Sequence, residues 1–207
     1  MNFDPGDIEG VVDSVYERLG YGRDEAKRPS TIARLLYGPS CLQYVTTMRA
    51  LGHCGTRNGQ PMIGVRSGLS RPRQEDAIGH EILHIELNIP HGEGRDELEW
   101  ACDYGAAALQ MPRRAYQHRI NRLGPHWAQL ATSFGVTETS ACLRAGEVED
   151  RPIAVVAGIV RARGAMQRRT ERELRGFTRR PPPGIVSAKL GDERGRWVVE
   201  ERWAEAV

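Results

Sequence analysis

The sequence predicts an α+β protein, in which a mostly helical domain carries a small antiparallel sheet and a C-terminal appendage follows. Three observations lead to this prediction. Apolar residues recur at helical spacing in seven segments. Two short strand-like segments flank the turn dipeptide Asn58-Gly59. A basic stretch interrupted by prolines lies in the last quarter of the chain. We therefore expect a main domain at residues 1–147 and an extension with strands at residues 148–207.

The first two predicted helices are defined by an apolar stripe and by the glycines that end them. The first helix has an apolar stripe and ends at Gly20 and Gly22. The second runs from about Thr31 to Tyr37 and ends at Gly38 and Pro39. The stripe of the first helix consists of Ile8, Val11, Val12, Val15 and Leu19.

Two strands come next in the prediction. Leu42–Thr47 and Pro61–Arg66 are rich in residues that favour strands, and Asn58-Gly59 between them is typical of a hairpin turn. The segment that separates them is longer than a tight hairpin. We therefore expect a small sheet without assigning the intervening residues.

The middle of the chain is predicted to be helical and the end to contain strands. Residues 127–144 also have the pattern of a helix-turn-helix. However, Glu138, Thr139 and Ser140 stand where DNA reading needs basic and amide side chains, so we expect packing against the main domain. The expected helices cover residues 74–89, 97–110, 113–123, 126–134 and 138–145, and the expected strands cover residues 153–160, 185–190 and 196–203.

Composition excludes several classes of protein. The chain has 207 residues, of which 40% are apolar and 27% charged, so it is neither disordered nor a coiled coil. Its longest apolar run, Ile153–Val160, is far shorter than the roughly 20 residues that span a bilayer. Met1–Gly10 is acidic, unlike a secretory signal, and the cysteines at 41, 54, 102 and 142 form no CxxC pair. We expect a cytoplasmic protein with reduced thiols and no membrane partner.

The net charge of +2 conceals one strongly basic segment. Arg161–Arg180 holds eight arginines against Glu171 and Glu173, which gives +6, so the remaining residues carry −4. Such a segment is either a solvated face or a contact for an acidic partner. Nucleic-acid binding is expected only through this segment.

The motif with a chemical meaning is His80-Glu81-Ile82-Leu83-His84, which matches the HExxH signature of zinc sites. On a helix, residues four apart lie about 6 Å from each other at their Cβ atoms, so both imidazoles face one metal ion. The opposite side of this helix carries an isoleucine stripe. It consists of Ile78, Ile82, Ile85 and Ile89.

A third ligand is predicted at Glu99. Another class of zinc protease, the metzincins, would require a glycine at position 87 and a histidine at position 90. This chain has Leu87 and Pro90 there, and His91 misses the expected place by one residue, so that class is disfavoured. Glu99 and Asp103 are one helical turn apart on a second helix rich in small residues. Glu99 would reach the metal, and Asp103 would accept the outer N–H of a ligating histidine. The alternative is that Glu99 completes a capping box with Asp96.

Glu81 is the candidate general base, because a carboxylate beside a zinc-bound water can take its proton and pass it to a leaving amine. A further donor is needed to hold the oxyanion that forms. The sequence leaves four candidates for this role. They are His91, Tyr104, His118 and His126.

These residues resemble the ImmA/IrrE-type metallopeptidases over about residues 26–147. The resemblance rests on the run from Arg71 through Gly79 to His84 and on the block from Glu99 to Pro112, EWACDYGAAALQMP. It implies a zincin-like fold, with His80, His84 and Glu99 as zinc ligands and Glu81 as base. It also implies a regulatory protease of bacteria or mobile elements, whose substrate is a protein such as a transcriptional repressor.

Two functions follow as hypotheses. The first is a zinc-dependent endopeptidase that cleaves a transcriptional repressor. The second is a non-catalytic module in which the same ligands hold structural zinc and the protein acts by contact with a protein or DNA partner. Both bind zinc, so metal content does not distinguish them, whereas loss of cleavage in a variant of Glu81 does.

Overall fold

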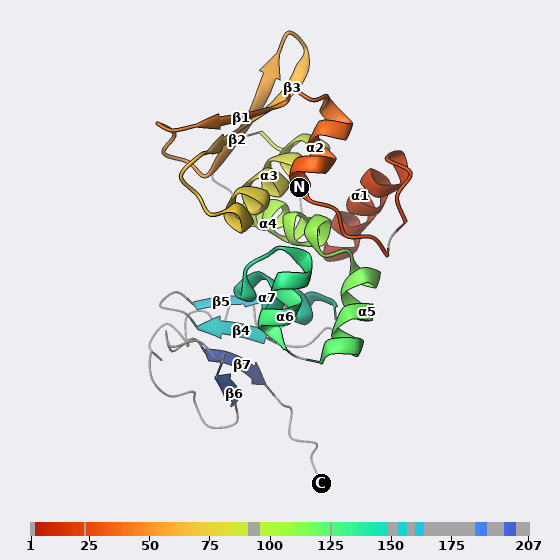
Figure 1. The fold of residues 1–207 in the computed structure, drawn as a ribbon, viewed down its shortest axis with the longest axis vertical. Helices are drawn as coiled ribbons and strands as arrows, with labels where there is room; N and C mark the ends of the chain where they lie inside the picture. Colours follow the sequence, from red (N-terminus) through yellow and green to blue (C-terminus); the bar gives the residue numbers. More distant parts are fainter. Residues whose placement is uncertain are drawn as a thin grey trace. The chain divides into compact units, whose positions relative to one another are not determined.

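The computed structural model describes residues 3–22, 24–90, 96–124 and 126–148, and four short strands after them. They confirm the predicted class, a mostly helical α+β fold (Figure 1). Among the described helices, none combines the length and apolarity that a membrane span requires. The helices are α1 (Pro5–Arg18), α2 (Pro29–Tyr37), α3 (Arg71–Glu86), α4 (Asp96–Gln110), α5 (Arg113–Leu123), α6 (Trp127–Phe134) and α7 (Glu138–Val148). The strands are β1 (Leu42–Val45), β2 (Gly52–Arg57), β3 (Gln60–Arg66), β4 (Ile153–Val156), β5 (Val160–Arg163), β6 (Ile185–Lys189) and β7 (Trp197–Glu201).

The chain divides into two compact units. One contains α1 to α5, the first three strands and Thr132–Thr137; the other contains Leu123–Ala131, α7 and the last four strands. The helix pair predicted for residues 127–144 is present as α6 and α7, with Gly135 at a φ of 71° between them. The predicted boundary between residues 147 and 148 stays a prediction.

The first sheet is mixed, which corrects the expectation of a purely antiparallel one. Its order is β1-β3-β2, in which β1 runs parallel to β3 and β2 antiparallel to it. Asn58 and Gly59 both have positive φ and join β2 to β3 as a two-residue hairpin. The predicted strands therefore exist as β1 and β3, but the hairpin partner of β3 is β2, which the sequence analysis left unassigned.

The second sheet belongs to the other unit. It is antiparallel throughout, in the order β5-β4-β7-β6, and the predicted hairpin near the C-terminus is present as β6 and β7. The single strand expected at residues 153–160 is instead the pair β4 and β5. Of the basic segment Arg161–Arg180, only Arg161–Arg163 are described, as part of β5; the others lie outside the described residues.

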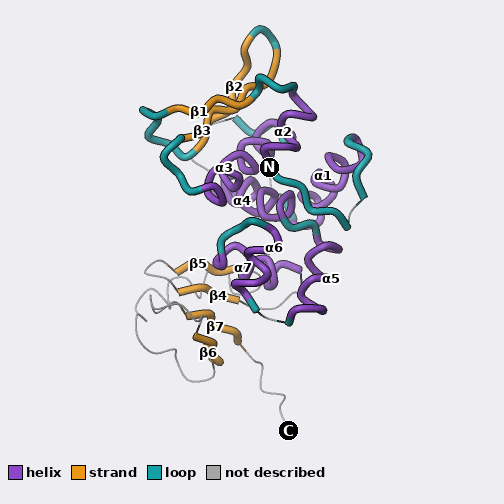
Figure 2. The backbone as a smooth tube through the Cα atoms, viewed as in Figure 1, coloured by secondary structure: helices purple, strands orange, loops and turns teal. Residues whose placement is uncertain are grey.

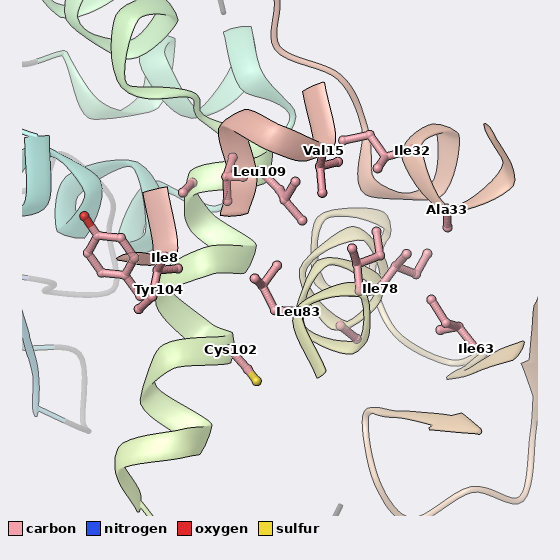
Figure 3. Close-up of a cluster of buried hydrophobic side chains, with 14 of the residues drawn as sticks. Ile8, Val15, Ile32, Ala33, Ile63, Ile78, Leu83, Cys102, Tyr104 and Leu109 are labelled. Atoms are coloured by element: carbon pink, nitrogen blue, oxygen red, sulfur yellow. The ribbon is translucent and has the colours of Figure 1, made fainter. Parts of the chain in front are cut away.

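Helix α1 begins and packs as its sequence predicts. A capping box at Asp4 and Asp7 starts it: the Asp7 N–H donates to Asp4 at 2.9 Å and the Asp4 N–H donates back at 3.3 Å. Its stripe of Ile8, Val12 and Val15 is buried in the core (Figure 3). The hydroxyl of the buried Tyr16 donates to the Leu109 carbonyl of α4 at 2.7 Å, which ties α1 to α4.

A buried carboxylate ties α2 to α3. Helix α2 has no side-chain cap of its own, but Glu75 of α3 accepts hydrogen bonds from the Ser30 N–H and hydroxyl, both at 2.8 Å. A negative charge at a helix N-terminus satisfies free N–H groups and is favoured by the helix dipole. Glu75 therefore caps α2 from a neighbouring helix.

Helix α3 contacts β2 and β3 as well as α2 and α4 (Figures 1 and 2). Two glycines bring α3 and α4 together. A Cβ atom at Gly79 would lie 3.2 Å from the Cα and Cβ atoms of Ala106, and one at Gly105 would lie 2.4 Å from Cγ of Leu83. Leu83 thus occupies the space that a side chain at position 105 would need, and the two helix axes approach closely.

This packing predicts that Gly105→Ala destabilises the protein although alanine favours helices. The added methyl group must displace Leu83 and Ile8, an overpacking cost of about 1–3 kcal/mol that exceeds the gain in helix propensity. Gly10→Ala is the matched control, because Gly10 lies on the exposed side of α1 with open space around it; it should stabilise by up to about 1 kcal/mol. Urea denaturation of both variants measures the difference. Equal midpoints would contradict the packing argument.

Candidate metal centre

Helix α3 brings the HExxH residues into the structure as expected, with His80 and His84 one turn apart. Ile78 and Ile82 are fully buried on the other side of the helix, in the core cluster that fills the space between α3, the sheet and α1. The His84 side chain is 0% exposed and that of His80 is 20% exposed. The isoleucine stripe therefore fixes the rotation of α3 that turns both imidazoles to the same side.

The end of α3 orients His84. Asn88, with a φ of 52°, follows the last turn, and the N–H of Ile89 donates to the carbonyl of His84 at 2.9 Å, while the N–H of Asn88 donates to that of Ile85 at 3.2 Å. This is a Schellman motif, which closes a helix C-terminus. It also places the Ile89 carbonyl 3.0 Å from Nδ1 of His84. The helix end thus holds the ring with Nδ1 as the donor and Nε2 pointing away.

A side chain of α4 orients His80 in the same way. Oδ1 of Asp103 lies 2.9 Å from Nδ1 of His80, which is the contact expected for a carboxylate behind a ligating histidine. Burial lowers the pKa of His80, but the hydrogen bond and charge of Asp103, together with the charges of Glu81 and Glu99, outweigh it, and the net shift is upward. The pKa of His84 is lowered, chiefly by burial, which favours its neutral form.

Possible metal-binding atoms of three residues, His80, His84 and Glu99, lie close together. Nε2 of His80 lies 3.1 Å from Nε2 of His84 and 3.2 Å from a carboxylate oxygen of Glu99, and Nε2 of His84 lies 3.8 Å from the other oxygen. Glu99, the fourth residue of α4, therefore turns its carboxylate to the histidines. Helix α4 begins at Asp96, and the choice between a ligand and a capping box at Glu99 stays a prediction.

This donor set suits a divalent metal ion. Because each Nδ1 donates to an oxygen, the Nε2 atoms of the two neutral imidazoles present lone pairs, which face each other and the Glu99 carboxylate. A cation between them would remove the repulsion. Two donors that bind one tetrahedral zinc ion at about 2.0–2.1 Å are roughly 3.3 Å apart, which is close to the distances observed here.

Glu81 lies on the neighbouring side of α3, against β2. Its side chain is buried, and its carboxylate accepts hydrogen bonds from the main-chain N–H and the thiol of Cys54. Burial raises the pKa of Glu81 to about 7, although the charge of His80 acts in the opposite direction. Burial and the Glu81 carboxylate raise the pKa of the Cys54 thiol to about 12. Glu81 therefore changes protonation near neutral pH.

A glycine makes room for this carboxylate. A Cβ atom at Gly52, the first residue of β2, would lie 2.7 Å from Oε1 and 2.9 Å from Cγ of Glu81. The sequence analysis did not identify Gly52 or Cys54 as part of the site, because their contact with Glu81 depends on a strand that lacks the usual strand-forming residues.

The structure adds one more residue to the group. The sulfur of Cys102 and one ring nitrogen each of His80 and His84 lie within 4.8 Å of one another. Cys102 is 0% exposed, and burial, together with the charges of Glu99 and Asp103, raises the pKa of its thiol. Sequence reasoning treated it only as a small residue, although its spacing of three from Glu99 was visible.

Three of the four candidates for an oxyanion donor lie in the described part of the chain. The Tyr104 hydroxyl donates to Glu9 of α1 at 3.0 Å. His118 on α5 and His126 before α6 are exposed, and His91 lies outside the described residues. The structure gives no reason to choose any of them.

Comparisons with known proteins match a family model and one solved structure. Residues 43–145 match the family model of the IrrE N-terminal-like domain, Peptidase_M78. No curated protein sequence matches the chain. Among solved structures, a Mycobacterium tuberculosis transcriptional regulator is similar in fold with a TM-score of 0.52 and 14% identity, over 72% of this chain and 51% of its own. The chain therefore spans about half the length of that regulator.

The contact at Gly52 generates a prediction. Gly52→Ala should lower the free energy of unfolding by about 1–3 kcal/mol, because the methyl group collides with the Glu81 carboxylate and one of them must move. Gly55→Ala in the same strand meets nothing within 4 Å and should change it by less than about 0.5 kcal/mol. Chemical denaturation of the pair provides the measurement. If the two variants are equally stable, Gly52 does not confine Glu81.

Proposed function

Through residues 43–145 the chain belongs to the IrrE N-terminal-like family, Peptidase_M78, and from this premise we propose that it is a zinc-dependent endopeptidase. The observation that carries the proposal is the meeting of His80, His84 and Glu99 donors within 3.8 Å, with both Nδ1 atoms anchored behind them. His80, His84 and Glu99 would hold the zinc ion. Zinc in this position supplies Lewis acidity.

The remaining groups have distinct roles in this proposal. The carboxylate of Glu81 takes a proton from the attacking water and delivers it to the leaving amide nitrogen, a task for which a pKa near 7 is well matched. Asp103 and the Ile89 carbonyl keep the Nδ1 atoms protonated, so each Nε2 stays available as a ligand. Gly52 and Cys54 of β2 hold Glu81 in place and keep bulk water from it.

We further propose that the substrate is a transcriptional repressor and that the protein acts in the cytoplasm. The family supports a regulatory peptidase, and the neighbour of similar fold is described as a transcriptional regulator. All four cysteines lie in the described part of the chain and carry thiols rather than disulfides, which suits a reducing compartment.

A second function has one observation in its favour. Cys102 lies close enough to the histidine nitrogens to compete for the fourth position of a metal ion, and a closed shell of four protein donors is typical of structural zinc. In that case the protein would regulate its partner, a protein or DNA, by contact and without cleavage.

Removal of a proposed ligand should remove the metal. The purified protein should contain one zinc ion, and His80→Ala, His84→Ala and Glu99→Ala should each weaken its binding by more than about 100-fold, since loss of an outer partner alone costs 10- to 100-fold. His118→Ala takes away an exposed histidine of α5 and should retain full occupancy. Metal analysis after dialysis against a weak chelator tests this. If Glu99→Ala retains full zinc occupancy, Glu99 is not the third ligand, and Asp103 is the next candidate.

Glu81→Gln separates the two functions. Glutamine has the size of glutamate but cannot accept a proton at neutral pH, so cleavage should fall by about 10²- to 10⁴-fold. Zinc content and the circular dichroism spectrum should not change. The substrate for the assay is the repressor encoded beside the protein's own gene, incubated with the zinc-loaded full chain. If the wild type leaves this repressor intact yet relieves repression, and Glu81→Gln does the same, the peptidase proposal is wrong and the protein acts by contact.

A further inference from the structure

We propose that Cys102 is a fourth protein ligand of the metal centre, so that its sulfur joins the donors of His80, His84 and Glu99. The inference rests on the proposed metal site and adds to it a donor of a different chemical class. It concerns this chain's own residues and is independent of whether the protein cleaves anything.

The first argument is the position of Cys102 on α4. Glu99, Cys102 and Asp103 are spaced by three and four residues, which places them on one side of the helix. Glu99 and Asp103 both contact His80 from this side, at 3.2 and 2.9 Å. The side chain of Cys102 projects from α4 toward α3 (Figure 3). Cys102 thus lies on the same part of α4 as two residues that already reach the histidines.

The second argument is distance. The sulfur and one nitrogen from each imidazole lie within 4.8 Å of one another. A thiolate binds zinc at about 2.3 Å and an imidazole nitrogen at about 2.0–2.1 Å, so a sulfur and a nitrogen on the same tetrahedral ion are roughly 3.6 Å apart. A side-chain adjustment of about 1 Å brings the sulfur into this range, which is within the reach of a χ1 rotation.

The third argument is the chemistry of the set. Two imidazoles, one thiolate and one carboxylate form a tetrahedral set that favours thiophilic ions such as Zn²⁺ and Co²⁺. When the sulfur binds, the S–H bond breaks, its proton leaves to solvent, and a sulfur–metal bond forms without any change of oxidation state. Cys54 does not share this position, because its thiol is hydrogen-bonded to Glu81.

The bound thiolate would change what the centre does. Four protein donors close the shell, whereas a catalytic site keeps one position open. Cys102 would therefore hold the metal in a resting form, and entry of a substrate would require the sulfur to leave. A chain with alanine at this position would have the open arrangement at all times.

Cobalt provides the test, because it reports sulfur directly. The metal-free full chain is titrated with Co²⁺ alone, as wild type, Cys102→Ser, Cys102→Ala and the matched control Cys54→Ser. We expect a near-ultraviolet sulfur-to-cobalt charge-transfer band in the wild type and in Cys54→Ser. The band should be absent from both variants of Cys102, whose visible d–d bands still show Co²⁺ bound, and their affinity for Zn²⁺ should fall at least about tenfold.

The outcomes separate this inference from the proposed function. Visible d–d bands without the charge-transfer band in the wild type would overturn the role of Cys102 and leave the site of His80, His84 and Glu99 intact. A charge-transfer band that disappears in Cys54→Ser but persists in Cys102→Ala would overturn it as well, in favour of Cys54. If the wild type binds no Co²⁺ or Zn²⁺ at all, both proposals fail together. Cys102→Ala is included because the buried serine hydroxyl of Cys102→Ser could unfold the chain, and in that case Cys102→Ala still provides the test.

Discussion

The close contact between α3 and α4 is the constraint on which the candidate centre depends. Gly79 lies against Ala106 at a distance that leaves little space for a methyl group, and Gly105 lies against Leu83 at a distance that excludes one. On α3, Gly79 directly precedes His80 and Leu83 directly precedes His84. Because nothing larger separates the helices, a carboxylate from α4 reaches an imidazole of α3 at 3.2 Å. Larger side chains at Gly79 or Gly105 would move α3 and α4 apart and would increase the distance between the imidazoles and the Glu99 carboxylate.

The two imidazoles are oriented by groups of different origin. His84 is held by the Schellman motif of its own helix, through the Ile89 carbonyl, and this arrangement forms as soon as α3 ends correctly. His80 is held by Asp103, so its orientation exists only when α4 has docked. Local structure thus prepares one ligand, and tertiary packing completes the pair. A loss of packing between the helices affects His80 and Glu99 before it affects His84.

The helices and the spacing of the candidate ligands could be predicted from the sequence, whereas strand pairing and contacts between distant segments could not. The spacing of His80 and His84, and of Glu99 and Asp103, expresses helical geometry, which is local. Strand β2 was missed because two of its six residues, Gly52 and Gly55, are glycines, which disfavour strands, and it depends on pairing with β3. The strand β1 was predicted, but its parallel pairing with β3 was not, since the Asn58-Gly59 signal identifies only the hairpin partner of β3. Contacts such as that between Gly52 and Glu81 arise only once these distant segments meet.

Cys102 shows how one helix face can present two chemistries. Glu99 and Cys102 lie on the same side of α4, one more exposed, with 48% of its side chain accessible, and the other buried. With the carboxylate alone, a bound metal would keep one position open for the reaction proposed for Glu81. With the sulfur added, the shell would be closed and Glu81 would have no catalytic role. The choice between a peptidase and a regulator that acts by contact is therefore not a choice between folds. It depends on the number of donors that α4 supplies, and a movement of one buried side chain is enough to change that number.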